Sequence, residues 1–152
     1  MPSLIQGTTR AAILAETVTA LTGVVPLASI YTSRSDVLAP AECPAITLTM
    51  DRESDALQLD GQTGLCRPYF DRSCDLVIGC HVSSSADTTT DTALNTLVEA
   101  TRAALFGSLT WLAAANQITA SIADYYVGSG EGGEYTAAAR LTVSITYSVQ
   151  YG

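Results

Sequence analysis

The chain of 152 residues contains seven Arg, no Lys and fifteen acidic residues, and its formal net charge is −8. Nucleic acids and anionic membranes are bound largely through Lys and Arg, so this balance argues against both kinds of partner. No apolar run approaches the roughly 20 residues of a membrane helix, and no basic region followed by an apolar block stands near residue 1. We therefore expect no membrane segment, no signal peptide and synthesis inside the cell.

Charged residues make up 14% of the chain, against roughly 25% in typical domains. Interface cores are depleted of charge. Two interpretations follow: a subunit that functions inside an assembly, which we favour, and a soluble monomer whose composition reflects skewed codon use. The length predicts a single domain spanning residues 1–152 with a core of its own.

The first third of the chain predicts one helix and two strands. Apolar residues recur at helical spacing over residues 8–21, and Gly23 can end that helix. Short strands are expected at residues 28–32 and 44–50, with a loop between them. The predicted buried positions are Ala11, Leu14, Val18 and Leu21 on the helix and Ile46, Leu48 and Met50 on the second strand.

A long polar segment, residues 51–67, lacks periodicity and contains Gly61 and Gly64, so we expect a loop. Loops of this length are usually functional or disordered. The next strand is predicted at residues 69–83, with every second residue facing inward. The expected inward residues are Cys74, Leu76, Ile78, Cys80 and Val82.

A second helix is predicted to end at Phe106, with Asp87 and Thr90 as its capping residues. Residues 108–115 are expected to form either a short turn of helix or a packed connection. The predicted buried stripe of the second helix comprises Leu94, Leu97, Val98, Thr101 and Leu105.

The chain ends with two predicted strands, residues 117–127 and 137–151, joined by a glycine-rich turn. The last strand alternates without a break. Apolar Leu141, Val143, Ile145, Tyr147, Val149 and Tyr151 share one face, and polar Thr142, Ser144, Thr146, Ser148 and Gln150 share the other. The element order α-β-β-β-α-β-β predicts an α+β fold. We expect a two-layer sandwich in which two helices cover a mainly antiparallel sheet of four to five strands.

No group of residues predicts catalysis, a cofactor or a metal site. The four cysteines form no C-x-x-C pair, and Cys74 and Cys80 fit a core better than a zinc site or a disulfide. Gly128, Gly130 and Gly133 match G-x-G-x-x-G, but this turn leads into a strand, which indicates a hairpin loop rather than a dinucleotide site.

Two further patterns also favour structural interpretations. Asp51, Glu53 and Asp55 are spaced like calcium ligands, but Ala56 and Gln62 stand where that loop requires Gly and Glu. The single histidine, His81, is expected on the face opposite the cysteines. Because no serine elbow accompanies it, a surface or interface histidine is favoured over a catalytic one.

The order of these elements resembles that of the tail terminator proteins of long-tailed bacteriophages, the minor tail protein U-like and tail completion family. The resemblance covers nearly the whole chain. It rests on the N-terminal helix, the segments 30–34, 43–48, 74–81 and 87–105, and a closing hairpin that ends in Ile145, Thr146 and Tyr147.

The resemblance implies a structural virion protein without catalytic residues, assembled in the host cytoplasm. Its implied form is a homo-oligomeric, six-fold ring at the head-proximal end of the tail tube. The ring would stop tube growth and dock the head connector or stopper, while DNA passes through its lumen without specific binding. An acidic lumen would suit that passage because carboxylates repel the duplex.

We predict that contacts between subunits and with the tube involve nine residues, chosen because Arg suits interfaces and because the 142–146 face carries no charge. They are Arg34, Arg52, Asp55, Asp60, Arg67, Arg72, Thr142, Ser144 and Thr146. Two alternatives stay open: another neck or head–tail completion protein of similar fold, and a small ligand-binding α+β protein or enzyme that uses His81.

Overall fold

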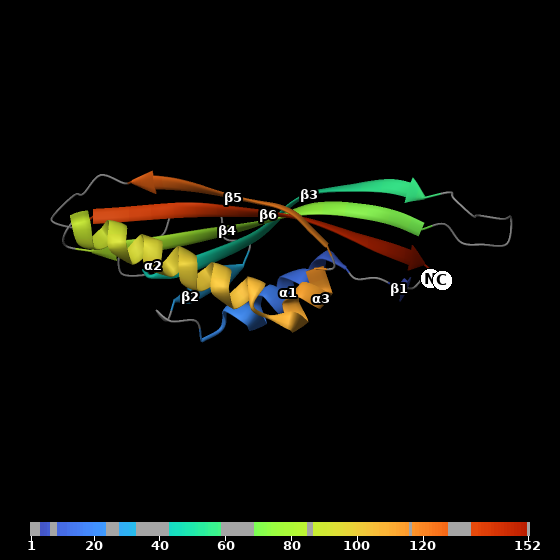
Figure 1. Cartoon of the computed structure of the whole chain (residues 1–152), viewed down its shortest axis with the longest axis horizontal. Helices are drawn as coiled ribbons and strands as arrows, with labels where there is room; N and C mark the ends of the chain where they lie inside the picture. Colours follow the sequence, from blue (N-terminus) through green and yellow to red (C-terminus); the bar gives the residue numbers. More distant parts are fainter. Residues whose placement is uncertain are drawn as a thin grey trace, which may run out of the picture.

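A computed structural model describes residues 4–6, 9–23, 28–32, 43–58, 69–84, 87–115, 117–127 and 135–151. In this part of the chain, three helices lie against one side of a six-stranded mixed sheet (Figure 1). The predicted α+β class is confirmed, and β1 and α3 are additions to the predicted order. The elements are β1 (Leu4–Gln6), α1 (Arg10–Leu21), β2 (Ser29–Thr32), β3 (Ala45–Gln58), β4 (Tyr69–Ser84), α2 (Asp87–Phe106), α3 (Leu109–Ala115), β5 (Gln117–Val127) and β6 (Tyr135–Tyr151).

Strand β6 organises the sheet, because both of its edges are paired. One edge pairs with β4 along almost the whole strand. The other edge pairs first with β5 and then, near its end, with β1. Strand β3 pairs with β4, and β2 completes the sheet beside β3. Every described pairing is antiparallel except that of β2 with β3, so the prediction of a mainly antiparallel sheet is confirmed.

The alternation read from the sequence separates the two faces of the sheet correctly. The inward residues of β3, β4 and β6 are buried because the helices cover that face. The hydroxyl-bearing residues between them on β6 remain partly exposed. The buried set comprises Ile46, Leu48, Met50, Cys74, Leu76, Ile78, Cys80, Val82, Leu141, Val143, Ile145, Tyr147 and Val149.

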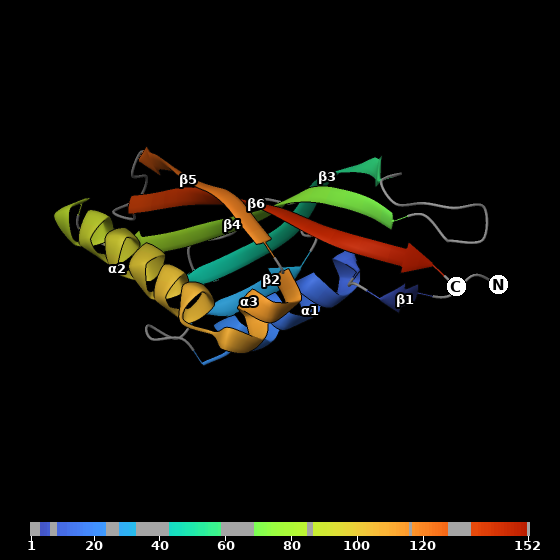
Figure 2. The same ribbon diagram turned by 45° about the vertical axis from the view of Figure 1, so that its right-hand side comes forward.

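The helix layer is built from α2, which packs on β4 and β6, and from α1 and α3, which pack on each other (Figure 2). All five residues of the stripe predicted for α2 are buried, including Thr101, whose hydroxyl donates to the Leu97 carbonyl at 2.8 Å. That bond satisfies the polar group inside the core.

The stripe predicted for α1 is partly wrong. Ala11 is exposed, whereas Ile13, Thr17 and Leu21 are buried. The helix is rotated about its own axis relative to the predicted orientation, so that Thr17 faces the core. The Thr17 hydroxyl accepts a hydrogen bond from the indole Nε1 of Trp111 at 2.9 Å and donates to the Ile13 carbonyl at 2.7 Å. A polar residue with two such bonds can occupy a core position that hydrophobic periodicity assigns elsewhere.

The loop predicted at residues 51–67 is also wrong over its first half, since β3 continues to Gln58. A β-bulge between Asp51 and Glu53 shifts the register, and Arg52 adopts a positive φ of 50° there. The bulge moves one residue out of the two-residue alternation, so the strand period is hidden in the sequence. Residues 59–67 lie outside the described residues.

The predicted helix ends are confirmed in one case and corrected in another. Gly23 follows α1 with a φ of 80°, a conformation that glycine adopts without strain. Helix α2 begins at Asp87, so Thr90 lies in the first turn and is buried rather than capping the helix. Residues 109–115 form a short helix, one of the two forms expected.

Candidate interaction surface

The face of the sheet opposite the helices, which we call the outer face, has no helix packed over it among the described residues. Its side chains come from alternate positions of β3, β4, β5 and β6. The structure places Thr142, Ser144 and Thr146 side by side on this face, as the sequence predicts. The outer face is therefore a broad uncovered surface in the part of the chain described.

Three cross-strand pairs join β4 and β6 on the outer face, and we call them the hydroxyl ladder. The Ser144 hydroxyl donates to Asp75 Oδ1 at 2.9 Å, and the Ser148 hydroxyl donates to Asp71 Oδ1 at 2.9 Å. Between them, the hydroxyls of Ser73 and Thr146 lie 3.3 Å apart. These bonds hold the side chains in fixed positions, which reduces the entropy lost when a partner binds.

Sequence reasoning missed the contribution of β4 to this ladder. Asp71, Ser73 and Asp75 occupy alternate positions opposite the inward cysteine face, and that spacing was visible in the sequence. The pairing of each with a particular β6 residue depends on the strand register, which only the structure supplies.

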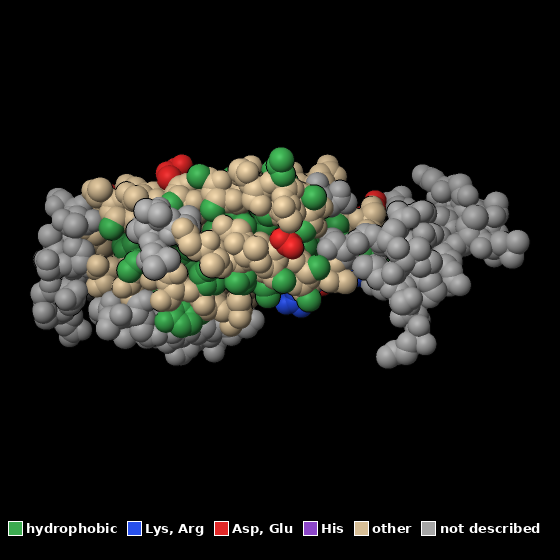
Figure 3. Space-filling model, turned by 90° about the horizontal axis from the view of Figure 1, so that it is seen from below, with side chains coloured by type: hydrophobic (Ala, Val, Ile, Leu, Met, Phe, Trp, Pro, Cys, Tyr) green, Lys and Arg blue, Asp and Glu red, His purple; other side chains and the backbone are tan. Residues whose placement is uncertain are grey.

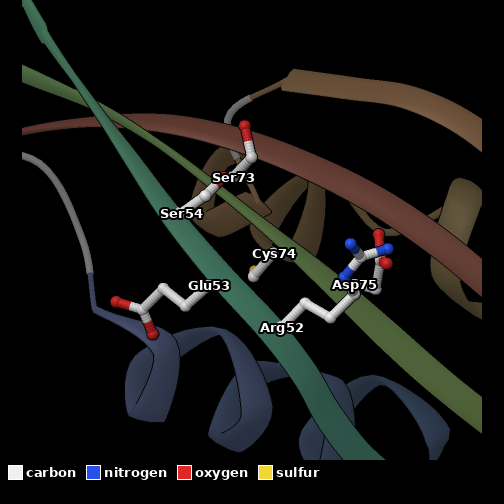
Figure 4. Close-up of a pocket in the computed structure, with 6 residues that line it drawn as sticks. All are labelled: Arg52, Glu53, Ser54, Ser73, Cys74 and Asp75. Atoms are coloured by element: carbon white, nitrogen blue, oxygen red, sulfur yellow. The ribbon is translucent and has the colours of Figure 1, made fainter.

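The bulge on β3 points neighbouring charges in different directions. Figure 4 shows Arg52 extending toward Asp75, while Glu53 leaves the strand on the side of α1. A hollow of about 520 Å³ lies between the bulge and β4. In the described part of the chain, the Arg52 guanidinium makes no ion pair. Among the described residues, Arg52 therefore has no ion-pair partner, although it is predicted to contact a neighbouring subunit.

Arg72, by contrast, makes ion pairs inside the chain. Its Nε lies 2.6 Å from Asp55 Oδ1 and 3.1 Å from Glu53 Oε1. These residues lie on the helix side of the sheet, beyond the bulge, because Arg72 pairs in register with the buried Tyr147. A role for Arg72 and Asp55 between subunits stays a prediction. The other predicted contact residues, Arg34, Asp60 and Arg67, lie outside the described residues.

Cys74 and Tyr147 are buried next to this charge cluster. Burial, reinforced by the charges of Glu53 and Asp75, raises the pKa of the Cys74 thiol to about 11. Burial raises the pKa of the Tyr147 phenol to about 12, and the neighbouring Cys74 and Glu53 add smaller contributions in the same direction. The Tyr147 hydroxyl also has no hydrogen-bond partner of standard geometry. Both groups are therefore kept neutral, and neither is an activated nucleophile.

We expect the fold to lose stability in alkali. The folded chain keeps both protons at a higher pH than the unfolded chain, so the unfolded state binds fewer protons between about pH 9 and about pH 12. The free energy of unfolding therefore falls as pH rises through this range, by about 3 kcal/mol for a phenol whose pKa moves from 10 to about 12. Urea unfolding at about pH 8 and about pH 11 measures the part of this loss that occurs below pH 11, about half of it for the phenol, and Tyr147→Phe is expected to show a smaller loss.

His81 lies over a shallow cavity of about 250 Å³ on the outer face. Its Nε2 is 3.2 Å from the Thr47 hydroxyl, and the two side chains meet above Gly79, where a Cβ would collide with both. Burial lowers the pKa of the imidazole, so the ring is neutral near pH 7. The described lining residues include Arg140 and Tyr126 but no carboxylate or thiol. Among the described lining residues, the imidazole thus has a hydroxyl partner in Thr47 but no carboxylate to orient it as in a catalytic triad.

The described residues also contain no metal-binding cluster and no membrane-spanning helix. Among them, no three or more His, Cys, Asp or Glu residues gather closely enough to hold a metal ion. None of the described helices has the length and hydropathy needed to cross a bilayer. Cys74 and Cys80 are free, buried thiols in this part of the chain.

Comparisons with known proteins find similarity to solved structures but not to any protein family. No protein-family model matches the chain, and no curated protein matches it. Among solved structures, the chain is similar to a chain of the virion of a native gene transfer agent particle, at 15% sequence identity and a TM-score of 0.39. The alignment covers 95% of this chain and 96% of that one. A likeness of this degree does not assign a function to this chain.

Proposed function

We propose that this protein is a non-enzymatic structural subunit of a phage-like virion, a tail terminator that forms a ring. In this proposal the ring binds the end of the tail tube, stops its polymerisation and presents a docking surface to the head connector or stopper. DNA passes through the lumen without specific binding. In this proposal the protein is located in the virion neck, and it is assembled there in the host cytoplasm.

The outer face is the observation that carries this proposal. A sheet covered by helices on one side only leaves its second side open to partners, and here β6 contributes a row of ordered hydroxyl groups to that side. Two of these hydroxyls donate to the carboxylates of Asp71 and Asp75, so both charges already have a hydrogen-bond partner before a contact desolvates them. The order of elements, which resembles that of tail terminators, supports the more specific role.

The acidic balance of the chain supports the passage of DNA in the same proposal. The chain has seven basic and fifteen acidic residues, so a channel built from it repels phosphates more readily than it binds them. An assembled particle whose channel is lined by Arg rather than by acids contradicts this part of the proposal.

Thr146→Asp tests the outer face. Thr146 is partly exposed in the middle of the hydroxyl ladder, so we expect the isolated chain to fold normally. Ring formation and tube capping are expected to fail, because a carboxylate desolvated in an interface without a partner costs several kcal/mol. Thermal unfolding checks the fold, and electron microscopy with purified tail tubes checks the capping. Asn95→Asp, on the exposed side of α2, serves as the charge-matched control.

The proposal also predicts the phenotype of particles made without the protein. Tubes should lack a terminal ring, vary in length and fail to join heads. Uniform tails that join heads in its absence would rule out a tail terminator.

His81→Ala separates the structural proposal from the ligand-binding alternative. The imidazole contacts Thr47 in the lining of a shallow cavity, so its loss is expected to leave the isolated chain folded. Thermal unfolding measures this directly. A turnover or small-molecule binding activity that disappears with His81→Ala would favour the alternative.

A further inference from the structure

The exposed large hydrophobic side chains of the described residues fall in two groups. Phe106 and Leu109 lie where α2 meets α3, and we call this site the α2–α3 corner. Ile122, Tyr125 and Tyr126 lie on β5. Leu109 is 83% exposed and Ile122 is 59% exposed, the highest value in each group. Paired exposed patches of this kind mark interaction sites.

Strand β5 is held to the sheet along one edge only, and its other edge is unpaired among the described residues. Ile122 and Tyr126 pair in register with Thr142 and Ala138, which places both side chains on the outer face. None of the described side chains of β5 is buried. We call Ile122 and Tyr126 the β5 patch. It borders the 250 Å³ cavity, since Tyr126 forms part of the cavity wall.

The α2–α3 corner is a rigid projection. The ring of Phe106 packs edge-to-face on that of Trp111, with centroids 5.9 Å apart. Trp111 is fully buried and donates its indole N–H to Thr17 of α1. Helix α3 is therefore anchored through its third residue, so the backbone that carries Leu109 is held in place before binding. Rigid apolar side chains of this kind are common anchors of interfaces.

The two sites are complementary in charge as well. Helix α2 has twenty residues and no basic residue in its last turn, so the negative end of its dipole at the α2–α3 corner is not compensated within the helix. Arg140 lies between the β5 patch residues, opposite Asp124 in the register, and lines the same cavity. Its guanidinium makes no ion pair in the part of the chain described. Among the described residues, the β5 patch thus offers a guanidinium without an ion pair, next to Asp124, and the corner offers the C-terminal carbonyl end of α2.

We propose that the α2–α3 corner of one copy binds the β5 patch of the next copy, with Leu109 directed to the cavity beside Tyr126 and Arg140 directed to the C-terminal end of α2. The corner belongs to the helix layer and the patch to the outer face, so the two lie on opposite sides of the molecule (Figures 1 and 2). Contact between two different surfaces is heterologous, and it repeats from copy to copy until a ring closes. The inference rests on the self-association in the proposed function.

Two single variants and their mixture test this contact. Leu109→Asp removes the corner and keeps the patch, whereas Ile122→Asp removes the patch and keeps the corner. Both residues are exposed, so both variants are expected to unfold at the temperature of the unmodified chain. In analytical ultracentrifugation the unmodified chain should form higher oligomers, and each variant alone should sediment as a monomer of 15.9 kDa. Asn95→Asp should assemble like the unmodified chain.

An equal mixture of the two variants retains one intact contact. It should therefore form a dimer of twice the 15.9 kDa chain mass and nothing larger. A mixture that stays monomeric while the unmodified chain assembles overturns the heterologous contact, and so does an unmodified chain that is monomeric at its highest attainable concentration. This measurement uses the purified chain alone, so its outcome is separate from that of the capping assay. Self-association without tail capping would contradict the tail-terminator role but not this contact. Tail capping without self-association would contradict this contact.

Discussion

Replacing Tyr147 with Asp is expected to unfold the protein. Tyr147 is 1% exposed on the helix side of β6. Its neighbour Arg72 is already paired with Glu53 and Asp55, so a new carboxylate would find no free cation there. Burying such a charge costs several kcal/mol, which is of the order of the roughly 5–15 kcal/mol that stabilises a domain. Urea unfolding followed by circular dichroism measures the loss.

Two neighbouring variants make this prediction specific to the face of the sheet. Tyr147→Phe removes a buried hydroxyl that has no hydrogen-bond partner of standard geometry among the described residues, so we expect a stability close to that of the unmodified chain. Thr146→Asp places the same carboxylate one residue away on the outer face and should leave the isolated chain folded. Cooperative folding of Tyr147→Asp at near-normal stability would mean that the buried face has been misassigned.

Replacing Trp111 with Ala is expected to cost about 3–5 kcal/mol, the usual range for a large aromatic side chain removed from a core. Trp111 is 0% exposed and is the largest of the fully buried side chains. Its loss also removes the bond to Thr17 that joins α3 to α1. Because α3 carries Leu109, the variant should weaken self-association as well as stability. Thermal unfolding and sedimentation measure the two effects.

Smaller substitutions at the same site separate the hydrogen bond from the packing. Trp111→Phe keeps much of the ring but removes the indole N–H, and Thr17→Val keeps the shape but removes the acceptor. Each is expected to destabilise by about 1–3 kcal/mol, and the double variant by less than their sum. Additive losses in this cycle would show that the bond between the two side chains contributes nothing.

The long strands and α2 were predictable because their burial follows one simple period. On β6 and β4, every second side chain faces a single helix layer, so the alternation in the sequence is the burial pattern itself. On α2, five apolar or hydroxyl residues at helical spacing all reach the core. In these elements no distant residue changes the assignment.

The errors arose where a distant residue or a local irregularity decides the structure. Thr17 is buried on α1 because Trp111, almost a hundred positions later, supplies its partner. Residues 51–58 form a strand because β4 pairs with them on both sides of the bulge at Arg52. Neither the partner nor the bulge leaves a periodic signal in the residues concerned.

The interaction surface was predictable only in part. The uncharged face of Thr142, Ser144 and Thr146 is visible in the sequence, and the structure places these residues together. Their partners Asp71, Ser73 and Asp75, and the exposure of Leu109 and Ile122, are not visible, because an apolar residue on a helix or strand is ordinarily assigned to the core.

By itself, the sequence determined the α+β class, the two faces of β4 and β6, the buried stripe of α2 and the scarcity of charge, since all of these follow from composition and local period. The tertiary structure alone decided which strands pair, in which register the outer-face hydroxyls meet their partners, and which apolar side chains stay uncovered. Those features depend on contacts between residues far apart in the chain, and no local pattern specifies them.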